Sequence, residues 1–279
     1  SSFSGGESSG TDDMVIIELL EYDGNSDGGN SLLTTRTLRV QDASTDERVT
    51  TYDHDLRGNL ILQLNPTAPN VLNQVDHLGR VTATARYSAT TGLDTSDDPT
   101  SLATNRMALS ESLYDERGRV WRVKRHKIDP ADGSDDSTLR TNTWYDSEER
   151  VIKVDGESLT KTGYDRLGRV THRFTLAVDD DSVYADADDV TGDIVLVEDQ
   201  TGYESTDSDD VWVRATISRF HDDNDLLATT GALDTNVDSD DLKYTATNIE
   251  GRIQITANWY DAFGRVTDTV NYGTYGGSD

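Results

Sequence analysis

The sequence predicts an all-β fold in which antiparallel β-hairpins follow one another along the chain. Three observations predict it: a recurring pattern Tyr-Asp-x-x-Gly-Arg-Val, alternating apolar and polar residues around that pattern, and an excess of Asp, which favours turns and loops. The pattern recurs at spacings as short as 19 residues. We therefore expect a repeat architecture whose units stack into one continuous core.

The pattern has the residues that a tight hairpin requires. Asp-x-x-Gly fits a type I turn in which Asp accepts hydrogen bonds from the amides that follow it. The Gly takes the left-handed conformation and closes a three-residue hairpin through a bulge. The two variable positions are expected to face water and to constrain nothing. Val then begins the buried side of the return strand, and Arg is expected beside the Tyr ring or the Asp carboxylate.

Eight units of this kind lie between residues 52 and 266, and two of them, at 220–226 and 248–253, are weak copies. Residues 1–13 are expected to be a flexible Ser- and Gly-rich segment, and residues 14–279 to be a single repeat array. The residues assigned to the repeat are Tyr52, Asp53, Asp76, Gly79, Arg80, Tyr114, Asp115, Gly118, Arg119, Tyr145, Asp146, Arg150, Tyr164, Asp165, Gly168, Arg169, Gly251, Arg252, Tyr260, Asp261, Gly264 and Arg265.

Composition excludes several classes of function. The chain has 53 acidic and 25 basic residues, for a net charge of −28, which disfavours nucleic acid and anionic membranes as partners. It has no Cys, so disulfides and thiol chemistry are absent. No apolar run approaches the ~20 residues of a membrane-spanning helix. No nucleophile elbow or phosphate-binding loop occurs, so we expect a protein that is not an enzyme.

Acidic inserts separate some of the units, at 94–99, 129–136, 179–193, 205–210 and 234–241. One interpretation is that they are solvated hairpin loops. The other is calcium binding, because Ca²⁺ takes six to eight oxygen ligands. The candidate ligands are Asp23, Asn25 and Asp27 in one loop, and Asp186, Asp188 and Asp189 in another. Calcium is the one candidate cofactor, and none is required by the fold.

One basic run, residues 119–127, interrupts the acidic chain. Alternation places Arg119, Trp121, Val123 and Arg125 on one face of a strand and Val120, Arg122, Lys124 and His126 on the other. The run could bind a polyanion, or it could pair with acidic neighbouring strands or with another copy. The five histidines, at 54, 77, 126, 172 and 221, have no metal-binding spacing and are expected at the surface.

The repeated motif resembles the YD repeats of the Rhs family, which includes bacterial Rhs proteins, the C components of toxin complexes, and the teneurins. The resemblance covers about Tyr52 to Val266. It implies an array of β-hairpins that forms a spiralling strip, an open shell or a barrel segment. Such an array would enclose a toxic polypeptide or present an adhesion surface. "IDPADGSDD", at 128–136, lies between repeats, so no protease residues of the family are carried over.

The expected function is structural: an extracellular or cell-surface scaffold that associates with itself or with flanking repeats into a fibre, tube or shell wall. Two alternatives remain open. The first is an adhesion module that binds carbohydrate or a partner cell through exposed Tyr and Trp. The second is a segment of a toxin-encapsulating shell. The array is short for a closed shell, so either a longer chain or further copies would complete it.

Overall fold

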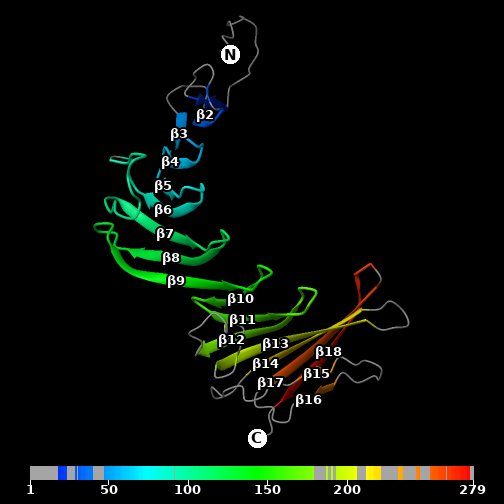
Figure 1. The fold of residues 1–279 in the computed structure, drawn as a ribbon. Helices are drawn as coiled ribbons and strands as arrows, with labels where there is room; N and C mark the ends of the chain where they lie inside the picture. Colours follow the sequence, from blue (N-terminus) through cyan, green and yellow to red (C-terminus); the bar gives the residue numbers. More distant parts are fainter. Residues whose placement is uncertain are drawn as a thin grey trace, which may run out of the picture. The chain divides into compact units, whose positions relative to one another are not determined.

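Antiparallel β-strands build the part of the chain that the structure describes (Figure 1). The structure is a computed structural model. It describes residues 18–23, 29, 31–39, 47–90, 92–178, 187, 190, 193–205, 212–220, 232–234, 243–245, 252–261 and 263–276. No helix that could cross a membrane occurs among these residues.

The described strands range from three residues in β15 and β16 to twelve in β13. The first nine are β1 (Glu18–Tyr22), β2 (Leu33–Arg39), β3 (Glu47–His54), β4 (Leu60–Leu64), β5 (Asn70–Val75), β6 (Val81–Tyr87), β7 (Arg106–Tyr114), β8 (Val120–Ile128) and β9 (Asp135–Tyr145). The others are β10 (Val151–Asp155), β11 (Leu159–Tyr164), β12 (Val170–Val178), β13 (Ile194–Ser205), β14 (Trp212–Phe220), β15 (Ala232–Asp234), β16 (Lys243–Thr245), β17 (Arg252–Tyr260) and β18 (Val266–Gly276).

The order of strands in the sheet is the order in the chain. The main sheet runs from β1 to β14 and continues with β17 and β18, while β15 and β16 form a two-stranded sheet of their own. Neighbouring strands such as β1 and β2, β5 and β6, β11 and β12, and β17 and β18 pair antiparallel, so hairpin follows hairpin. The predicted all-β array of antiparallel hairpins is confirmed.

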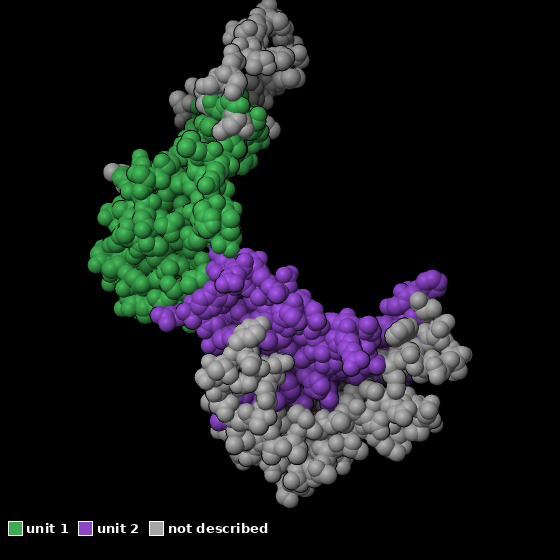
Figure 2. Space-filling view, in the orientation of Figure 1, with its two compact units in different colours: residues 1–113, 123–139 green, residues 114–122, 140–279 purple. Residues whose placement is uncertain are grey.

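The chain divides into two compact units (Figure 2). Unit 1 comprises residues 1–113 and 123–139, and its core is a row of side chains across four strands. Leu62 of β4 pairs with Leu72 of β5, which pairs with Ala85 of β6, which pairs with Leu109 of β7. All four are buried. Because directly opposed residues of neighbouring strands share a face, the repeat creates a continuous apolar stripe.

The insert between β6 and β7 packs over this core. Pro99 is fully buried, and the Tyr87 hydroxyl donates to the Leu102 carbonyl over 3.2 Å. Buried Arg106 binds the insert through hydrogen bonds from its guanidinium to the carbonyls of Pro99 and Thr100, at 3.1 and 3.2 Å. It also donates to the Gly133 carbonyl, in the loop between β8 and β9, over 3.1 Å. Residues 94–98 are nevertheless mostly exposed, as expected of a solvated loop, and only Pro99 of this acidic segment is buried.

Unit 2 comprises residues 114–122 and 140–279. Phe174, Leu176 and Val195 form its apolar cluster, with Leu159 and Val190 packed against it. Among the described residues of this unit, four charged side chains are also buried: Lys153, Lys161, Asp193 and Glu198. Burial of charge is costly unless it is compensated, so this group is unusual for a core.

Candidate functional site: the repeat clamp and an aromatic pocket

Each described Asp-x-x-Gly turn closes with the same two backbone hydrogen bonds. In one of them the Gly168 amide donates to the Asp165 carbonyl over 3.0 Å, and the Asp165 amide donates to the Arg169 carbonyl over 2.9 Å. Gly168 has φ +79°, and the register shifts where β11 meets β12. The same bonds occur at Asp76, Asp115 and Asp261. The predicted bulged hairpin is confirmed.

The turn aspartate accepts three further hydrogen bonds. Oδ1 of Asp165 accepts the amides of Leu167 and Arg169 at 2.9 and 2.8 Å, and Oδ2 accepts Nε of Arg169 at 2.6 Å. These bonds favour the ionised carboxylate. Against the opposing effect of burial, bonds of this kind lower the pKa values of Asp76, Asp115, Asp146, Asp165 and Asp261.

In the turns that begin at Asp115 and Asp146, the arginine also reaches the next unit. The Arg119 guanidinium lies 4.5 Å from the ring centre of Tyr145, and Arg150 lies 4.7 Å from that of Tyr164. The Tyr145 hydroxyl donates to the Val120 carbonyl, and the Tyr164 hydroxyl to the Val151 carbonyl, both over 2.8 Å. One unit therefore supplies Asp and Arg, and its successor supplies Tyr. We call this set of contacts the arginine clamp.

A third arginine clamp shows a unit that the sequence pattern did not reveal. Arg169 lies 4.2 Å from the ring centre of Tyr203, whose hydroxyl donates to the Val170 carbonyl over 3.0 Å. Tyr203 is followed by Glu204 rather than Asp, and an acidic insert separates it from the previous unit. The signal was present in the sequence, since "TGYE" at 201–204 matches "TGYD" at 162–165.

The first unit lies two residues further along than the sequence analysis placed it. Tyr52 and Asp53 lie in β3, and the turn aspartate is Asp55. Its Oδ1 accepts the amides of Arg57 and Asn59, and its Oδ2 accepts Nδ2 of Asn59 at 2.8 Å. An amide thus stands where later units have a guanidinium. The Tyr-Asp pair at 52–53 led to the wrong turn aspartate, because the turn depends on the Asp-x-x-Gly spacing.

Two other details differ from the predicted repeat. Glu149 stands where the other turns have Gly, yet it has φ +69°. The variable positions also do more than face water: guanidinium groups of Arg57 and Arg117 donate to the His77 and Ser147 carbonyls of the following turns. The apolar residues at such positions, Leu56, Leu78, Leu167 and Phe263, are exposed as expected.

The last described turn, which contains Asp261 and Arg265, differs from the others in its surroundings. Arg265 binds Asp261 as in the other units, through Nε at 2.7 Å. Its side chain is 75% exposed, whereas the equivalent Arg119 is 21% exposed. Its guanidinium lies 5.4 Å from the ring centre of Phe263 in its own turn. Tyr260 and Arg252 are the two ends of β17, and Gly251 lies outside the described residues.

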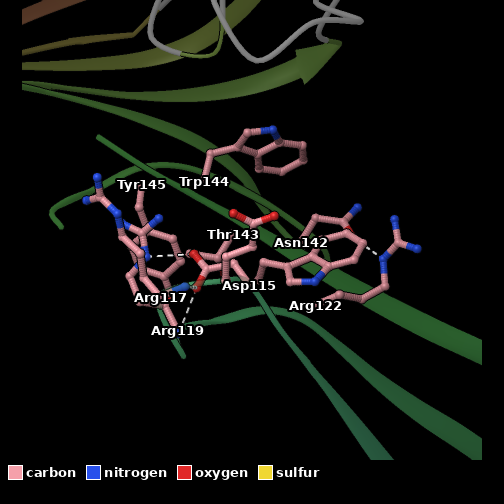
Figure 3. A pocket seen from close by; sticks show the side chains of 10 residues that line it. Asp115, Arg117, Arg119, Arg122, Asn142, Thr143, Trp144 and Tyr145 are labelled. Atoms are coloured by element: carbon pink, nitrogen blue, oxygen red, sulfur yellow. Dashed lines mark hydrogen bonds and ion pairs between the residues drawn. The ribbon is translucent and has the colours of Figure 1, made fainter. Parts of the chain in front are cut away.

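An aromatic pocket of about 630 Å³ lies beside one arginine clamp in unit 2 (Figure 3). It is lined by Asp115, Glu116, Arg117, Arg119, Trp121, Arg122, Asn142, Thr143, Trp144 and Tyr145. The view shows Arg117, Arg119 and Tyr145 at one end, Arg122 near the other, and Trp144 above them. Mostly apolar walls with a few convergent polar groups are typical of sites for small ligands.

Polar contacts fix the side chains around this pocket. Nε of Arg122 donates to Oδ1 of Asn142 over 2.6 Å, and Nδ2 of Asn142 donates to Oδ2 of Asp155 over 3.2 Å. The Arg122 guanidinium also lies 4.4 Å from the ring centre of Trp121. Buried Lys153 stands 4.9 Å from the ring centre of Trp144. The two indoles are therefore held in place by cations.

The basic run pairs with acidic side chains of its neighbours, which favours that interpretation over polyanion binding. Nζ of Lys124 lies 2.9 Å from Oε2 of Glu111, and Nζ of Lys127 binds Oδ2 of Asp136 at 2.5 Å. His126 contacts carboxylates through both ring nitrogens, Glu111 at 2.7 Å and Asp135 at 2.6 Å. Its side chain is only 9% exposed.

The expectation that the histidines lie at the surface is wrong for two of them. Besides His126, the ring of His172 stacks on Phe174 with centroids 5.8 Å apart, and burial lowers the pKa of His172. His77 lies in a turn, as expected, and His221 lies outside the described residues.

The calcium hypothesis stays a prediction. Asn25, Asp27, Asp186, Asp188 and Asp189 lie outside the described residues. Oδ1 of Asp23 accepts the Leu32 amide at 3.1 Å. Among the residues that the structure describes, no group of three or more His, Asp or Glu side chains is arranged to hold a metal ion.

Comparison with known proteins gives structural likeness at low identity. No protein-family model matches the sequence, and no curated protein is significantly similar to it. Three similar solved chains come from "Crystal Structure of TcdB2-TccC3-TEV", "Crystal Structure of TcdB2-TccC3 without hypervariable C-terminal region" and "Crystal Structure of TcdB2-TccC3-Cdc42". Identities are 10%, 11% and 10%, TM-scores are 0.32, 0.34 and 0.29, and 86%, 92% and 87% of this chain is covered. The chain spans 12%, 13% and 15% of the length of those chains.

Proposed function

We propose that this chain is a structural scaffold of the Rhs type, secreted or exposed at a cell surface, that extends by association with further copies of itself. The observation that carries the proposal is the series of arginine clamps. Asp, Arg and Tyr often act as catalytic groups in enzymes. In each clamp, however, their side chains hold one hairpin against the next. The resemblance of the motif to YD repeats supports the same role, in which the strip would be part of a shell wall.

The surface for this association is β18. Among the described strands, β18 pairs with β17 alone, so its outer edge carries backbone groups suited to another strand. Val266 and Val270 on β18 are 53% and 38% exposed. The exposed guanidinium of Arg265 is placed to receive a Tyr ring from the added strand, as Arg119 receives Tyr145. The proposed occupant is a strand from a second copy of the chain.

Light scattering after size exclusion and electron microscopy of the purified chain test this proposal. We expect a mass that rises with concentration, and filaments or tubes. Val266→Lys should reduce assembly, because it places a charge in the proposed contact. Leu167→Lys is the matched control, since Leu167 is 77% exposed in a turn outside that contact. A monomer at every concentration would contradict the proposal.

A second candidate function, carbohydrate binding, is favoured by the aromatic pocket. Sugar rings present an apolar face that stacks on indoles, and the guanidinium of Arg122, the Asn142 amide and the Thr143 hydroxyl offer hydrogen bonds to sugar hydroxyls. The proposed ligand is a neutral oligosaccharide, which the acidic surface of this chain would not repel.

Titration of Trp fluorescence with neutral oligosaccharides tests this second function. We expect weak, saturable binding that Trp121→Ala abolishes. Trp259→Ala is the matched control, because it removes an indole of β17 that does not line the pocket. Equal binding by both variants would place the sugar elsewhere, and an absence of saturation would exclude the pocket as its site.

A further inference from the structure

Four side chains form a buried row across unit 2. Lys153 of β10 pairs with Lys161 of β11, which pairs with Phe174 of β12, which pairs with Glu198 of β13. Their residues are 3%, 0%, 6% and 2% exposed. Opposed residues share a face, so Lys161 and Glu198 point to the same side of the sheet, with backbones about 10 Å apart across one intervening strand.

Asp193 completes this group. It immediately precedes β13, is 0% exposed, and its Oδ2 lies 2.6 Å from Nζ of Lys161. The apolar cluster of Phe174, Leu176 and Val195 belongs to the same two strands, β12 and β13. An ion pair buried in such surroundings adds little to stability, because desolvation offsets the attraction between the charges. An amine and a carboxyl group in contact and away from water are, however, well placed to react with each other.

We propose that Lys161 and Asp193 form an intramolecular isopeptide bond. The Lys161 ammonium gives one proton to the Asp193 carboxylate, and the lone pair of the resulting neutral Nζ attacks Cγ of the protonated Asp193 carboxyl group; as the C–N bond forms, Glu198 takes a second proton from Nζ. The bond from Cγ to the hydroxyl oxygen breaks, and that hydroxyl leaves as water with the proton that Glu198 returns. An ammonium and a carboxylate thus become one amide and one water, with no change of oxidation state.

The role of Glu198 follows from its position. Lys and Glu side chains that start about 10 Å apart on one face can bring Nζ and the carboxylate together between them. The proton has to move twice, away from the amine and then to the departing hydroxyl, and a buried carboxylate on the same face can carry it both ways. The bond would fasten β11 to the start of β13 across β12. In a chain without Cys it would be a covalent link that needs no oxidant.

The mass of the intact, purified full chain tests the proposal. We expect a mass lower than that of the sequence by one water molecule, and a branched proteolytic peptide that joins Lys161 to Asp193. Lys161→Arg and Asp193→Ala should each show the full mass of their sequences. Asp193→Asn should still form the bond by releasing ammonia, so its product should have the same mass as the crosslinked parent.

Two further variants separate the proposed chemistry from a structural role. Glu198→Gln keeps the shape of the side chain but cannot carry the proton, so it should fold and show the full mass. Lys153→Arg, in the same buried row, should keep the loss of water. Full mass in the folded parent chain would overturn the proposal. So would a water loss that persists in Lys161→Arg, because it would place the change elsewhere, for example in a succinimide at Asp155–Gly156.

Discussion

The guanidinium of Arg150 lies over the ring of Tyr164, 4.7 Å from its centre, and it is bound at the same time by Asp146, with Nε 2.6 Å from Oδ2. Asp146 and Arg150 belong to one hairpin turn and Tyr164 to the next. The Arg150 guanidinium also donates to the Asp165 carbonyl over 3.3 Å. One side chain therefore joins two turns, and the same stacking recurs in unit 2 between Arg119 and Tyr145 and between Arg169 and Tyr203.

Replacement of this arginine should be far more costly than replacement of the last one described. Arg150→Ala removes a charged hydrogen bond, the stacking on Tyr164 and a bond to the next turn, so we expect a loss of about 1.5–3 kcal/mol in the free energy of unfolding. Arg265→Ala removes a guanidinium that is 75% exposed and should cost about 0.5 kcal/mol or less. Urea unfolding followed by circular dichroism measures both; equal losses would show that the contact with the next unit contributes nothing.

Two turn substitutions should have opposite effects. Gly168→Ala places a Cβ at φ +79°, where its nearest neighbour would be Arg150 Nη1 at 3.8 Å, so the cost is backbone strain of about 1–2 kcal/mol. Glu149→Gly relieves the same strain at φ +69° and should stabilise by about 0.5–1 kcal/mol, because the greater entropy of unfolded Gly offsets part of the gain. Thermal melting measures both changes, and a destabilising Glu149→Gly would contradict this account of the turn.

The protein should lose stability in acid through its turn aspartates. Burial acts to raise the pKa of Asp76, but the hydrogen bonds from Arg80 and from the amides of Arg80 and Leu78 outweigh it and lower the pKa to about 2. An unfolded Asp has a pKa of about 3.9, so the unfolded chain binds more protons between about pH 4 and pH 2. The stabilisation by the ionised carboxylate is complete above this window and is lost as the pH falls to about 2.

Asp76→Asn provides the comparison for that acid transition. Asn keeps a side-chain oxygen for the backbone amides but has no carboxylate to protonate. Melting temperatures measured from pH 5 to pH 2 should therefore fall less steeply for the variant than for the parent chain. Identical pH dependence in the two proteins would show that Asp76 does not contribute in this way.

Arg106 should be essential to unit 1. It is 5% exposed and donates to three carbonyls of two loops, so Arg106→Leu leaves buried carbonyls without donors and should cost about 2–4 kcal/mol. Arg106→Lys should recover only part of this, because an ammonium lacks the planar arrangement of donors. A loss below about 1 kcal/mol for the Leu variant, measured by urea unfolding, would contradict the role given to this side chain.

Local features of the fold could be predicted from the sequence, and contacts between distant residues could not. The turn from Asp165 to Gly168 follows from the conformational preferences of its own residues, and the structure has it as predicted. The partner of Arg169 is Tyr203, which lies beyond an acidic insert, and nothing in the motif specifies the length of that insert.

The candidate sites show the same division. The aromatic pocket depends on which residues of β8 and β9 come together, and alternation within one strand does not determine this. Nothing in the sequence distinguishes Lys153 and Lys161 from other polar residues, and only the register places them in one buried row. Tyr52 and Asp53 show the opposite kind of error. They match the Tyr-Asp pair of the motif but lack the turn spacing, and the turn aspartate is Asp55, two residues further along.

A double-mutant cycle between Arg150 and Tyr164 tests the central claim most directly, namely that arginine clamps join consecutive units. The free energies of unfolding of the parent chain, Arg150→Ala, Tyr164→Leu and the double variant would be measured under one set of conditions. We predict a coupling energy of about 0.5–2 kcal/mol, so the double variant should lose less than the two single variants together. Losses that add within about 0.3–0.5 kcal/mol would contradict the claim, because the two side chains would then act independently.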